Sequence, residues 1–304
     1  MIDTALLDRI VRRLSAALAP PVGEMWPLVV DGRVVGALDP PRAMALARFA
    51  DRFVVDAREV RFAPHFTDAA SRTAAAASVA RALADEGRLS AWRDEPYAVG
   101  SDPDGAPSFL LERAAARYFG IRTFAAHVNG TTRRDGGVAM WIARRSTRKA
   151  IDPGLLDNLV GGGVAAGASV ASTVVKEAWE EAGLPSDLAC TARTVGILEI
   201  RRAQPDGLQL ETIFVHDLDL PPDVVPANRD GEVVGFRLET PDAIARLIAT
   251  EEGPDVVTAD ASLVIADWLM RHGFVPNGTP AWNALDRLRG QAAPLARLRR
   301  GGGS

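Results

Sequence analysis

The sequence predicts an α/β protein in two parts, a smaller α+β part over residues 1–120 and a larger part over residues 121–298. Up to about residue 120, short strand-like pairs alternate with alanine-rich helical segments. From residue 121 the pattern changes, and strand-like segments alternate with helices in the way that is typical of helices packed on a mixed sheet. With 304 residues, 47% of them hydrophobic, the chain is long enough to bury a sizeable core.

Each expected element of the first part has a local signal. Prolines begin or end helices, glycines end them, and an Asp-Gly pair turns a hairpin. In chain order we expect an amphipathic helix ended by Pro20 and Pro21, a hairpin turning at Asp31 and Gly32, a short helix begun by Pro40 and Pro41, a hairpin-like pair over residues 53–64, a helix from an N-cap at Ser71 to Gly87, and a helix over residues 108–120 ended by Gly120.

The second part contains apolar segments of strand character separated by turn residues and two helical segments. We expect strands over residues 122–133, 138–146, 196–202, 211–220 and 233–239, a turn over residues 130–137, a glycine loop over residues 158–172 followed by an acidic helix, a loop over residues 221–232, and helices over residues 241–250 and 262–273.

Composition excludes several classes of function. The net charge of −4 gives no reason to expect a nucleic-acid partner, and no apolar run approaches the roughly 18 residues of a membrane span. The only cysteine, Cys190, rules out an intramolecular disulfide and fits a reducing compartment. We therefore expect a soluble, cytoplasmic protein, for which a homodimer stays open. Residues 299–304 read as a flexible tail outside the fold.

Three carboxylates crowd one short segment, at Glu177, Glu180 and Glu181. In a helix these positions fall within a sector of roughly 100°, so their side chains are neighbours and repel one another. A positive charge must compensate them, either Lys176 or a divalent cation such as Mg²⁺, with Mn²⁺ as the alternative ion. The simpler interpretation is a solvated acidic helix face.

The setting of these acids is similar to a known motif. Residues 162–184 resemble the Nudix box, G-x(5)-E-x(7)-R-E-U-x-E-E-x-G-U, in which U is aliphatic. The three glutamates match in register, together with Gly162, Gly183 and Leu184. Lys176 stands where arginine is usual, and Ala168 replaces the first glutamate. The resemblance implies a Nudix α/β/α sandwich with a mixed sheet, preceded by the smaller α+β part.

Five further segments resemble one subgroup of Nudix proteins, so that the similarity covers nearly the whole chain. They span residues 92–99, 111–120, 127–130, 140–163 and 228–236. Members of this subgroup carry an N-terminal extension of unknown function, and in some fungi the module is fused to thiamine pyrophosphokinase. The first box glutamate is often replaced in the subgroup, so Ala168 does not by itself exclude activity.

The resemblance implies a set of roles for the box. Nudix proteins typically hydrolyse a diphosphate linked to another moiety. Glu177 and Glu181 would be the principal metal ligands, with Glu180 as a further ligand or a partner of the base, and Lys176 would orient these glutamates by ion pairing. The small residues that would let the backbone approach the diphosphate are Gly161, Gly162 and Gly163.

Candidates outside the box rest on weaker signals. Glu232 is the best candidate for the general base, against an ordinary turn acid. Because consecutive strand residues face opposite sides, one of Arg144 and Arg145 should face the phosphates. Asn158, with Asp157 beside it, precedes the box and could contact substrate or shape the loop.

Two more groups outside the box have structural alternatives. His127 is more simply a structural strand histidine, and Cys190 a structural cysteine. Trp92, Arg93 and Glu95 belong to the interface between the two parts or to substrate recognition, with core packing favoured for the tryptophan.

Three functions fit these residues. The first is Mg²⁺-dependent hydrolysis of thiamine diphosphate, or of its oxo and oxy forms, to the monophosphate, which would remove a damaged cofactor. The second is hydrolysis of a nucleoside diphosphate derivative such as ADP-ribose or a dinucleotide. The third is a non-catalytic sensor that binds a diphosphate, which Ala168 favours and the three adjacent glutamates oppose.

Overall fold

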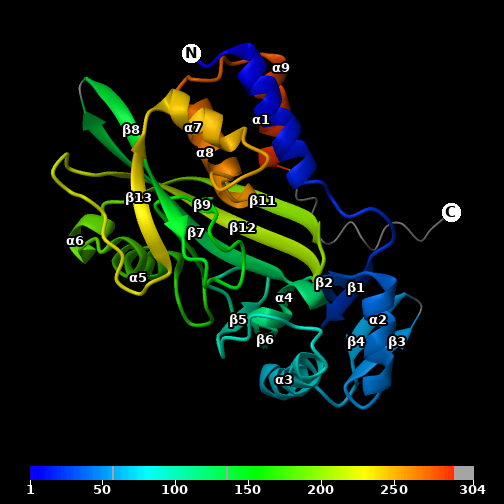
Figure 1. The fold of residues 1–304 in the computed structure, drawn as a ribbon. Coiled ribbons are helices and arrows are strands. Elements are labelled where there is room, and N and C mark those ends of the chain that lie inside the picture. The colour runs from blue at the N-terminus through cyan, green and yellow to red at the C-terminus, as the bar shows by residue number, and fades with distance from the viewer. Residues whose placement is uncertain (57, 135, 291–304) are drawn as a thin grey trace.

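The computed structural model describes residues 1–56, 58–134 and 136–290 (Figure 1). Within them the larger sheet has seven strands, in the order β11-β12-β7-β8-β13, with β10 paired to β7 and β9 paired to β8. Only the β12–β7 pairing of this sheet is parallel, so the predicted mixed sheet is confirmed. The strands are β7 (Arg122–Arg134), β8 (Gly137–Arg145), β9 (Leu156–Asp157), β10 (Val160–Gly163), β11 (Arg193–Gln204), β12 (Gly207–Asp219) and β13 (Val233–Glu239).

Helices cover both faces of this sheet, which makes it the middle layer of an α/β/α sandwich (Figure 1). One face carries α5 (Val170–Ala182) and α6 (Ser186–Ala189), and the other carries α1 (Thr4–Ala17), α7 (Pro241–Ile248), α8 (Ala259–Arg271) and α9 (Pro280–Arg289). Consecutive side chains of strand β8 point to opposite faces of the sheet and so enter the two cores in turn. Trp141 packs on the α5 side, whereas Met140 and Ile142 join the core that contains α8.

The first helix belongs to the core of the larger part, although it begins the chain. Leu7, Ile10 and Leu14 are buried in the same cluster as the residues of α8 and α9. Arg13 is 8% exposed and donates to the carbonyl oxygens of Ile248 and Val257 and to a serine hydroxyl. Helix α1 precedes residue 120 but packs in the core of the larger part. A boundary between residues 120 and 121 therefore does not separate the two cores, and the predicted domain division stays a prediction.

The smaller part is an α+β unit with its own core. Its sheet has the order β2-β1-β4-β3, and a separate hairpin pairs β5 with β6. Its elements are β1 (Trp26–Val30), β2 (Arg33–Leu38), α2 (Pro40–Leu46), the 3-10 turn η1 (Ala47–Phe49), β3 (Phe53–Asp56), β4 (Glu59–Phe62), α3 (Ala69–Asp85), β5 (Pro96–Val99), β6 (Phe109–Glu112), the 3-10 turn η2 (Arg113–Ala115) and α4 (Ala116–Phe119). The predicted hairpin turn is confirmed, because Asp31 and Gly32 both have positive φ.

Some local predictions for this part and for the end of the chain were wrong. The cap of α3 is Asp68, and Ser71 lies three residues later, where it completes a capping box. The predicted helix over residues 108–120 begins with strand β6 instead, because its apolar residues pair with β5 and pack on α3. Only the four residues of α4 are α-helical there, and Gly120 ends them with a φ of 54°. Helix α9 was not predicted at all.

The glycine run before the acidic helix is a strand rather than a loop. Residues 160–163 form β10 and pair antiparallel with residues 125–128 of β7. A Cβ on Gly162 would overlap with Cγ of Glu177 and lie 2.6 Å from its Cδ, and a Cβ on Gly163 would overlap with the hydroxyl of Tyr97. These positions are glycine because other side chains cross directly over the backbone, and not because the segment needs flexibility.

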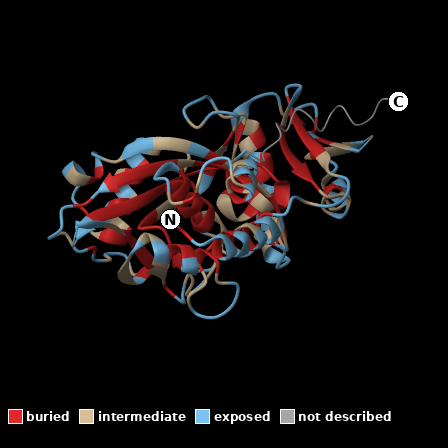
Figure 2. Cartoon of the chain, turned by 90° about the horizontal axis from the view of Figure 1, so that it is seen from above, coloured by how far each residue is buried: buried red, intermediate tan, exposed pale blue. Residues whose placement is uncertain are grey.

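Burial follows this architecture. Figure 2 shows buried residues along the strands of the sheets and on the helices packed against them, with exposed residues along the connecting loops. Within the described residues, every helix is too short or too polar to cross a membrane. The predicted tail over residues 299–304 lies outside the described residues.

Candidate active site

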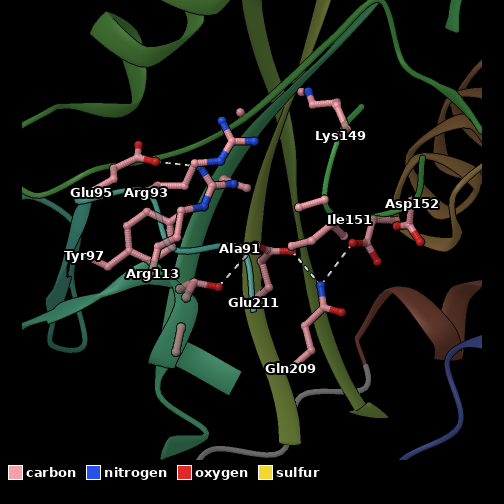
Figure 3. Close-up of a pocket in the computed structure, with 18 of the residues that line it drawn as sticks. Ala91, Arg93, Glu95, Tyr97, Arg113, Lys149, Ile151, Asp152, Gln209 and Glu211 are labelled. Carbon is pink, nitrogen blue, oxygen red and sulfur yellow. Dashed lines mark hydrogen bonds and ion pairs between the residues drawn. The ribbon is translucent and has the colours of Figure 1, made fainter. Parts of the chain in front are cut away.

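A cavity of about 440 Å³ lies where the two parts meet (Figure 3). The acidic helix α5, strands β7, β10 and β12, and the loop over residues 146–155 line it from the larger part. Residues 90–97 and 113–117 line it from the smaller part. The N-terminal part therefore forms one wall of the cavity that contains the box glutamates.

Local sequence fixes the acidic helix in place. Ser169 and Ser172 form a capping box at the start of α5, and Gly183 ends the helix with a φ of 64°. A Cβ at Gly183 would overlap with the carbonyl oxygen of Ala227, so only glycine fits there. Because both ends are fixed, the inner face of α5 is held against β10.

Glu181 is the most deeply placed of the box glutamates, with 4% of the residue exposed. Its carboxylate accepts from the backbone N–H of Gly161 at 3.0 Å and from Nζ of Lys149 at 3.0 Å. Burial raises the pKa of Glu181 to about 7, although Lys149 and the Gly161 N–H act against that rise. The protein therefore keeps a buried carboxylate at the cavity wall, supported by one backbone donor and one ammonium.

The other two box glutamates share Lys176. Its Nζ lies 3.0 Å from Glu177 Oε1 and 2.7 Å from Glu180 Oε2. Burial raises the pKa of Glu177 against the opposing effect of Lys176. The Lys176 side chain is 60% exposed, so these ion pairs are largely screened by solvent. The ion pairs of the predicted orienting role are present, and the role itself stays a prediction.

Glu232 lies in the loop before β13 and reaches the cavity beside Lys149. Lys149 Nζ is 2.5 Å from Oε2 of Glu232, and Arg93 Nη1 is 3.1 Å from Oε1. Burial alone would raise the pKa of Glu232, but Lys149 and Arg93 outweigh it and hold that pKa below its usual value. With a cation on each oxygen, Glu232 is a weak proton acceptor in this arrangement, which counts against its predicted role as general base.

The two consecutive arginines of β8 point to opposite sides of the strand, as expected for neighbouring strand residues. Arg145 lines the cavity, where its Nη1 donates to Asp157 at 2.7 Å and its other nitrogens donate to two backbone carbonyls. Arg144 instead donates to the carbonyl oxygens of Gly154 and Pro254 and pairs with Asp255. Arg145 is thus in position to contact a substrate. Arg144 is not among the residues that line the cavity, and its predicted substrate contact is not supported.

Asn158 lies behind the cavity wall rather than on it. It is 1% exposed, its Oδ1 lies 2.8 Å from Nδ1 of His127, and its Nδ2 donates to Asn129. His127 lines the cavity beneath Gly161. The structure therefore gives Asn158 a supporting position, which orients the histidine and the strand next to it, and does not bring it to the substrate-facing surface.

The wall from the smaller part includes the side chains of Arg93, Tyr97 and Arg113 (Figure 3). Arg113 donates to Glu95 at 2.6 Å and lies 5.7 Å from the centre of the Tyr97 ring. Burial raises the pKa of Tyr97 to about 12, so its phenol stays neutral. Trp92 packs against the core of the smaller part, with Arg81 stacked on its ring. From the smaller part the cavity wall thus holds three arginines, Arg93, Arg113 and Arg117. Arg93 is paired with Glu232, and Arg113 is paired with Glu95.

The end of the cavity near β12 has a different character. Glu211 accepts from Thr123 at 3.1 Å and from Gln209 at 2.9 Å, and Gln209 also donates to Asp260 at 3.0 Å (Figure 3). Burial and the nearby charge of Asp260 raise the pKa of Glu211. This end offers hydrogen-bond acceptors to a ligand, whereas the wall of arginines offers donors.

The sequence did not single out Lys149, Tyr97, Arg113 or Glu211. Lys149 lies inside a segment that resembles the Nudix subgroup, but a single loop lysine carries no spacing signal. Tyr97 and Arg113 come from strand and turn positions of the smaller part and meet the box only through the tertiary fold. Glu211 could have been suspected from its place in an otherwise apolar strand.

The carboxylates suit a hard divalent cation by their chemistry, because such ions prefer carboxylate oxygens. Within the described residues, however, no group of three or more acidic, histidine or cysteine side chains is already arranged to hold a metal. Lys149 bridges Glu181 and Glu232, and Lys176 bridges Glu177 and Glu180. The carboxylate oxygens of these glutamates are suitable ligands for a metal ion once the two lysines no longer occupy them.

Comparison with known proteins identifies the family of the chain. Residues 122–260 match the model of the NUDIX domain, and residues 11–123 match that of a domain of unknown function, DUF4743. Nudix hydrolase 20, chloroplastic, of Arabidopsis thaliana is 35% identical over 280 residues, which cover 88% of this chain and 74% of that protein. Nudix hydrolase 24, chloroplastic, of the same plant is 36% identical over 272 residues, covering 88% and 73%.

Among solved structures, the crystal structure of DR0079 from Deinococcus radiodurans has 24% identity and a TM-score of 0.43, and the match covers 57% of this chain and 98% of that one. The chain belongs to the Nudix hydrolase family. It is a pyrophosphohydrolase with the fold predicted from the box, and the alternative of a non-catalytic sensor is set aside.

Proposed function

We propose that this Nudix hydrolase cleaves thiamine diphosphate, or its oxidised oxo and oxy forms, to the monophosphate in a Mg²⁺-dependent reaction. Such an activity would remove a defective cofactor, and we place it in the cytoplasm. The resemblance of nearly the whole chain to the thiamine-linked subgroup suggests the substrate. The observation that carries the proposal is the two-ended cavity, with box glutamates and arginines at one end and acceptors at the other.

The end of the cavity near β12, which offers hydrogen-bond acceptors, supports thiamine as the group attached to the diphosphate. Thiamine carries a positively charged thiazolium ring and an aminopyrimidine with N–H donors. Glu211 and Asp260 offer carboxylate oxygens to such groups, and Gln209 links the two carboxylates. Asp260 is already paired with Arg202 at 3.4 Å, whereas Glu211 forms no ion pair among the described residues. A carboxylate such as Glu211 is stabilised by a cation and is poorly matched to a second anion. The adenosine ribose of ADP-ribose would place neutral hydroxyls there.

Glu177, Glu180 and Glu181 would hold the metal ion, with Mn²⁺ as the alternative to Mg²⁺. The bound ion would neutralise charge on the phosphate oxygens and hold the attacking water near the phosphorus atom. The proposed metal-holding glutamates differ in exposure to solvent. Glu181 is buried, whereas the side chain of Glu180 is 36% exposed.

The chain's own groups account for the rest of the site. Arg145 and Arg93 can bind phosphate oxygens at the box end, since arginine forms paired hydrogen bonds to phosphate. The glycine strand β10 brings backbone close to the same place. Glu232 can accept a proton from water only after Lys149 or Arg93 leaves one of its oxygens. The wall from the smaller part limits the access of bulk water.

Product analysis tests the proposal. Purified protein with Mg²⁺ is incubated in parallel with thiamine diphosphate, oxythiamine diphosphate and ADP-ribose, with Glu181→Gln as the inactive control. We expect thiamine-type monophosphates, and no product from the variant. Cleavage of ADP-ribose in preference to both thiamine compounds would overturn the substrate assignment and favour a nucleoside diphosphate derivative.

A further inference from the structure

The chain uses lysine in only two places. Of its 35 basic residues, all except Lys149 and Lys176 are arginines. Ion pairs elsewhere on the described surface use arginine, at exposed and buried positions alike. Both lysines contact glutamates of the acidic helix. This placement sets the two lysines apart from the general use of basic residues in the protein.

Lys149 is the less exposed member of the pair. Its side chain is 10% exposed, and its Nζ lies 3.0 Å from Glu181 Oε1 and 2.5 Å from Glu232 Oε2. The backbone that carries it is fixed, because Lys149 N–H donates to the Ser146 carbonyl and Ser146 N–H donates to the Glu232 carbonyl. The ammonium therefore sits at a defined point between a box glutamate and the glutamate of a distant loop.

The ammonium of Lys149 supplies a positive charge to the carboxylates of Glu181 and Glu232. It is a compact charge on a flexible stem, unlike the planar guanidinium. Its neighbour Arg145 is fixed by Asp157 and two backbone carbonyls, whereas the side chain of Lys149 contacts the two carboxylates alone among the hydrogen bonds and ion pairs of the described residues. Lys149 can thus turn away while the arginine beside it stays in place.

We propose that Lys149 is an internal counter-cation that holds Glu181 beside Glu232 until a divalent cation binds Glu181, after which its ammonium leaves that carboxylate. Lys149 is then a positioning residue, which competes with the metal in the free enzyme. The inference rests on the metal use assigned under the proposed function, and not on the identity of the substrate ring.

Manganese binding tests this competition without substrate. Free Mn²⁺ is measured by electron paramagnetic resonance for the wild type, Lys149→Met, Lys149→Arg and Arg148→Met. Arg148→Met is the matched control, because it removes a positive charge from the neighbouring residue of the same loop, which is exposed and does not line the cavity. We expect Lys149→Met to bind Mn²⁺ at least about fivefold more tightly, because a like charge in contact with Glu181 is lost. Arg148→Met should change binding by no more than about twofold.

Lys149→Arg keeps the charge and should not bind Mn²⁺ more tightly than the wild type. Unchanged or weaker Mn²⁺ binding by a folded Lys149→Met would overturn the proposal. So would equal gains in Lys149→Met and Arg148→Met, because a general charge effect would then explain both.

A second measurement needs no folded variant at position 149. Protein labelled with ¹⁵N only in lysine side chains has two Nζ groups, and Lys176→Arg assigns them. Addition of Mg²⁺ should shift the Lys149 signal over the concentration range in which the metal binds. A Lys149 signal that stays fixed while the site fills would refute displacement. Both experiments omit substrate, so failure of the thiamine assignment would leave their result interpretable.

Discussion

Replacing Glu181 with glutamine should make the stability of the metal-free protein less sensitive to pH. Glutamine keeps the size of the side chain, and its single amide oxygen can replace one of the two carboxylate oxygens that accept from the Gly161 N–H and from Lys149. It removes the one ionisable group whose folded-state pKa is raised from 4.5 to about 7 by burial. The comparison between wild type and Glu181→Gln therefore isolates the cost of ionising this carboxyl group.

The direction of the effect follows from proton binding. Below pH 4.5 the carboxyl group is protonated in the folded and the unfolded chain, so it contributes no pH dependence. Between pH 4.5 and about 7 the unfolded chain releases the proton while the folded chain retains it, so folding becomes less favourable as pH rises. Above about pH 7 the cost is complete and the difference becomes constant.

A pKa change from 4.5 to about 7 corresponds to about 3 kcal/mol. The free energy of unfolding of Glu181→Gln, minus that of the wild type, should therefore increase by about 3 kcal/mol between pH 4.5 and pH 8. Urea denaturation in EDTA, followed by tryptophan fluorescence at several pH values, measures this difference. Carboxyl groups that do not interact with Glu181 are present in both proteins, and their contributions cancel.

A difference that is independent of pH would show that Glu181 is not destabilised by burial. A difference that decreases as pH rises would show that Lys149 and the Gly161 N–H stabilise the ionised form more than burial opposes it. Either result would refute the electrostatic account of this carboxylate.

Three more predictions follow from contacts in the structure. Gly162→Ala places a Cβ 2.6 Å from Cδ of Glu177, so Glu177 must move, and both kcat, by at least about tenfold, and the melting temperature should fall. Arg145→Gln should raise KM for the diphosphate about tenfold, whereas Arg144→Gln, which lies outside the cavity lining, should leave KM unchanged. Arg13→Met should lower the free energy of unfolding by about 2–4 kcal/mol in urea denaturation, because two buried carbonyls lose their donor, without changing KM.

The sequence predicted those features that depend on local spacing. The register of the acidic helix, its end at Gly183 and the turn at Asp31 and Gly32 are all confirmed, because each is set by residues close together in the chain. The spacing of Glu177, Glu180 and Glu181 pointed to the helix that forms the cavity wall. Their catalytic roles stay predictions.

Features that depend on contacts between distant segments could not be predicted. Lys149 is 32 residues from Glu181 in the chain, and Arg93 is 139 residues from Glu232. Nothing in either local sequence indicates these pairs. The same reason explains why the glycines of β10 were taken for a flexible loop, since the side chains of Glu177 and Tyr97 that cross them come from elsewhere in the chain.

The most direct test of the central claim compares glutamate variants on the thiamine-type diphosphate that is cleaved fastest. Glu177→Gln and Glu181→Gln should each lower kcat at least about a hundredfold at saturating Mg²⁺, because each removes a carboxylate that faces the diphosphate end of the cavity. Arg144→Gln should keep the wild-type kcat. If both glutamate variants retained wild-type kcat while folded, the acidic helix would not be the site of hydrolysis, and the account would fail.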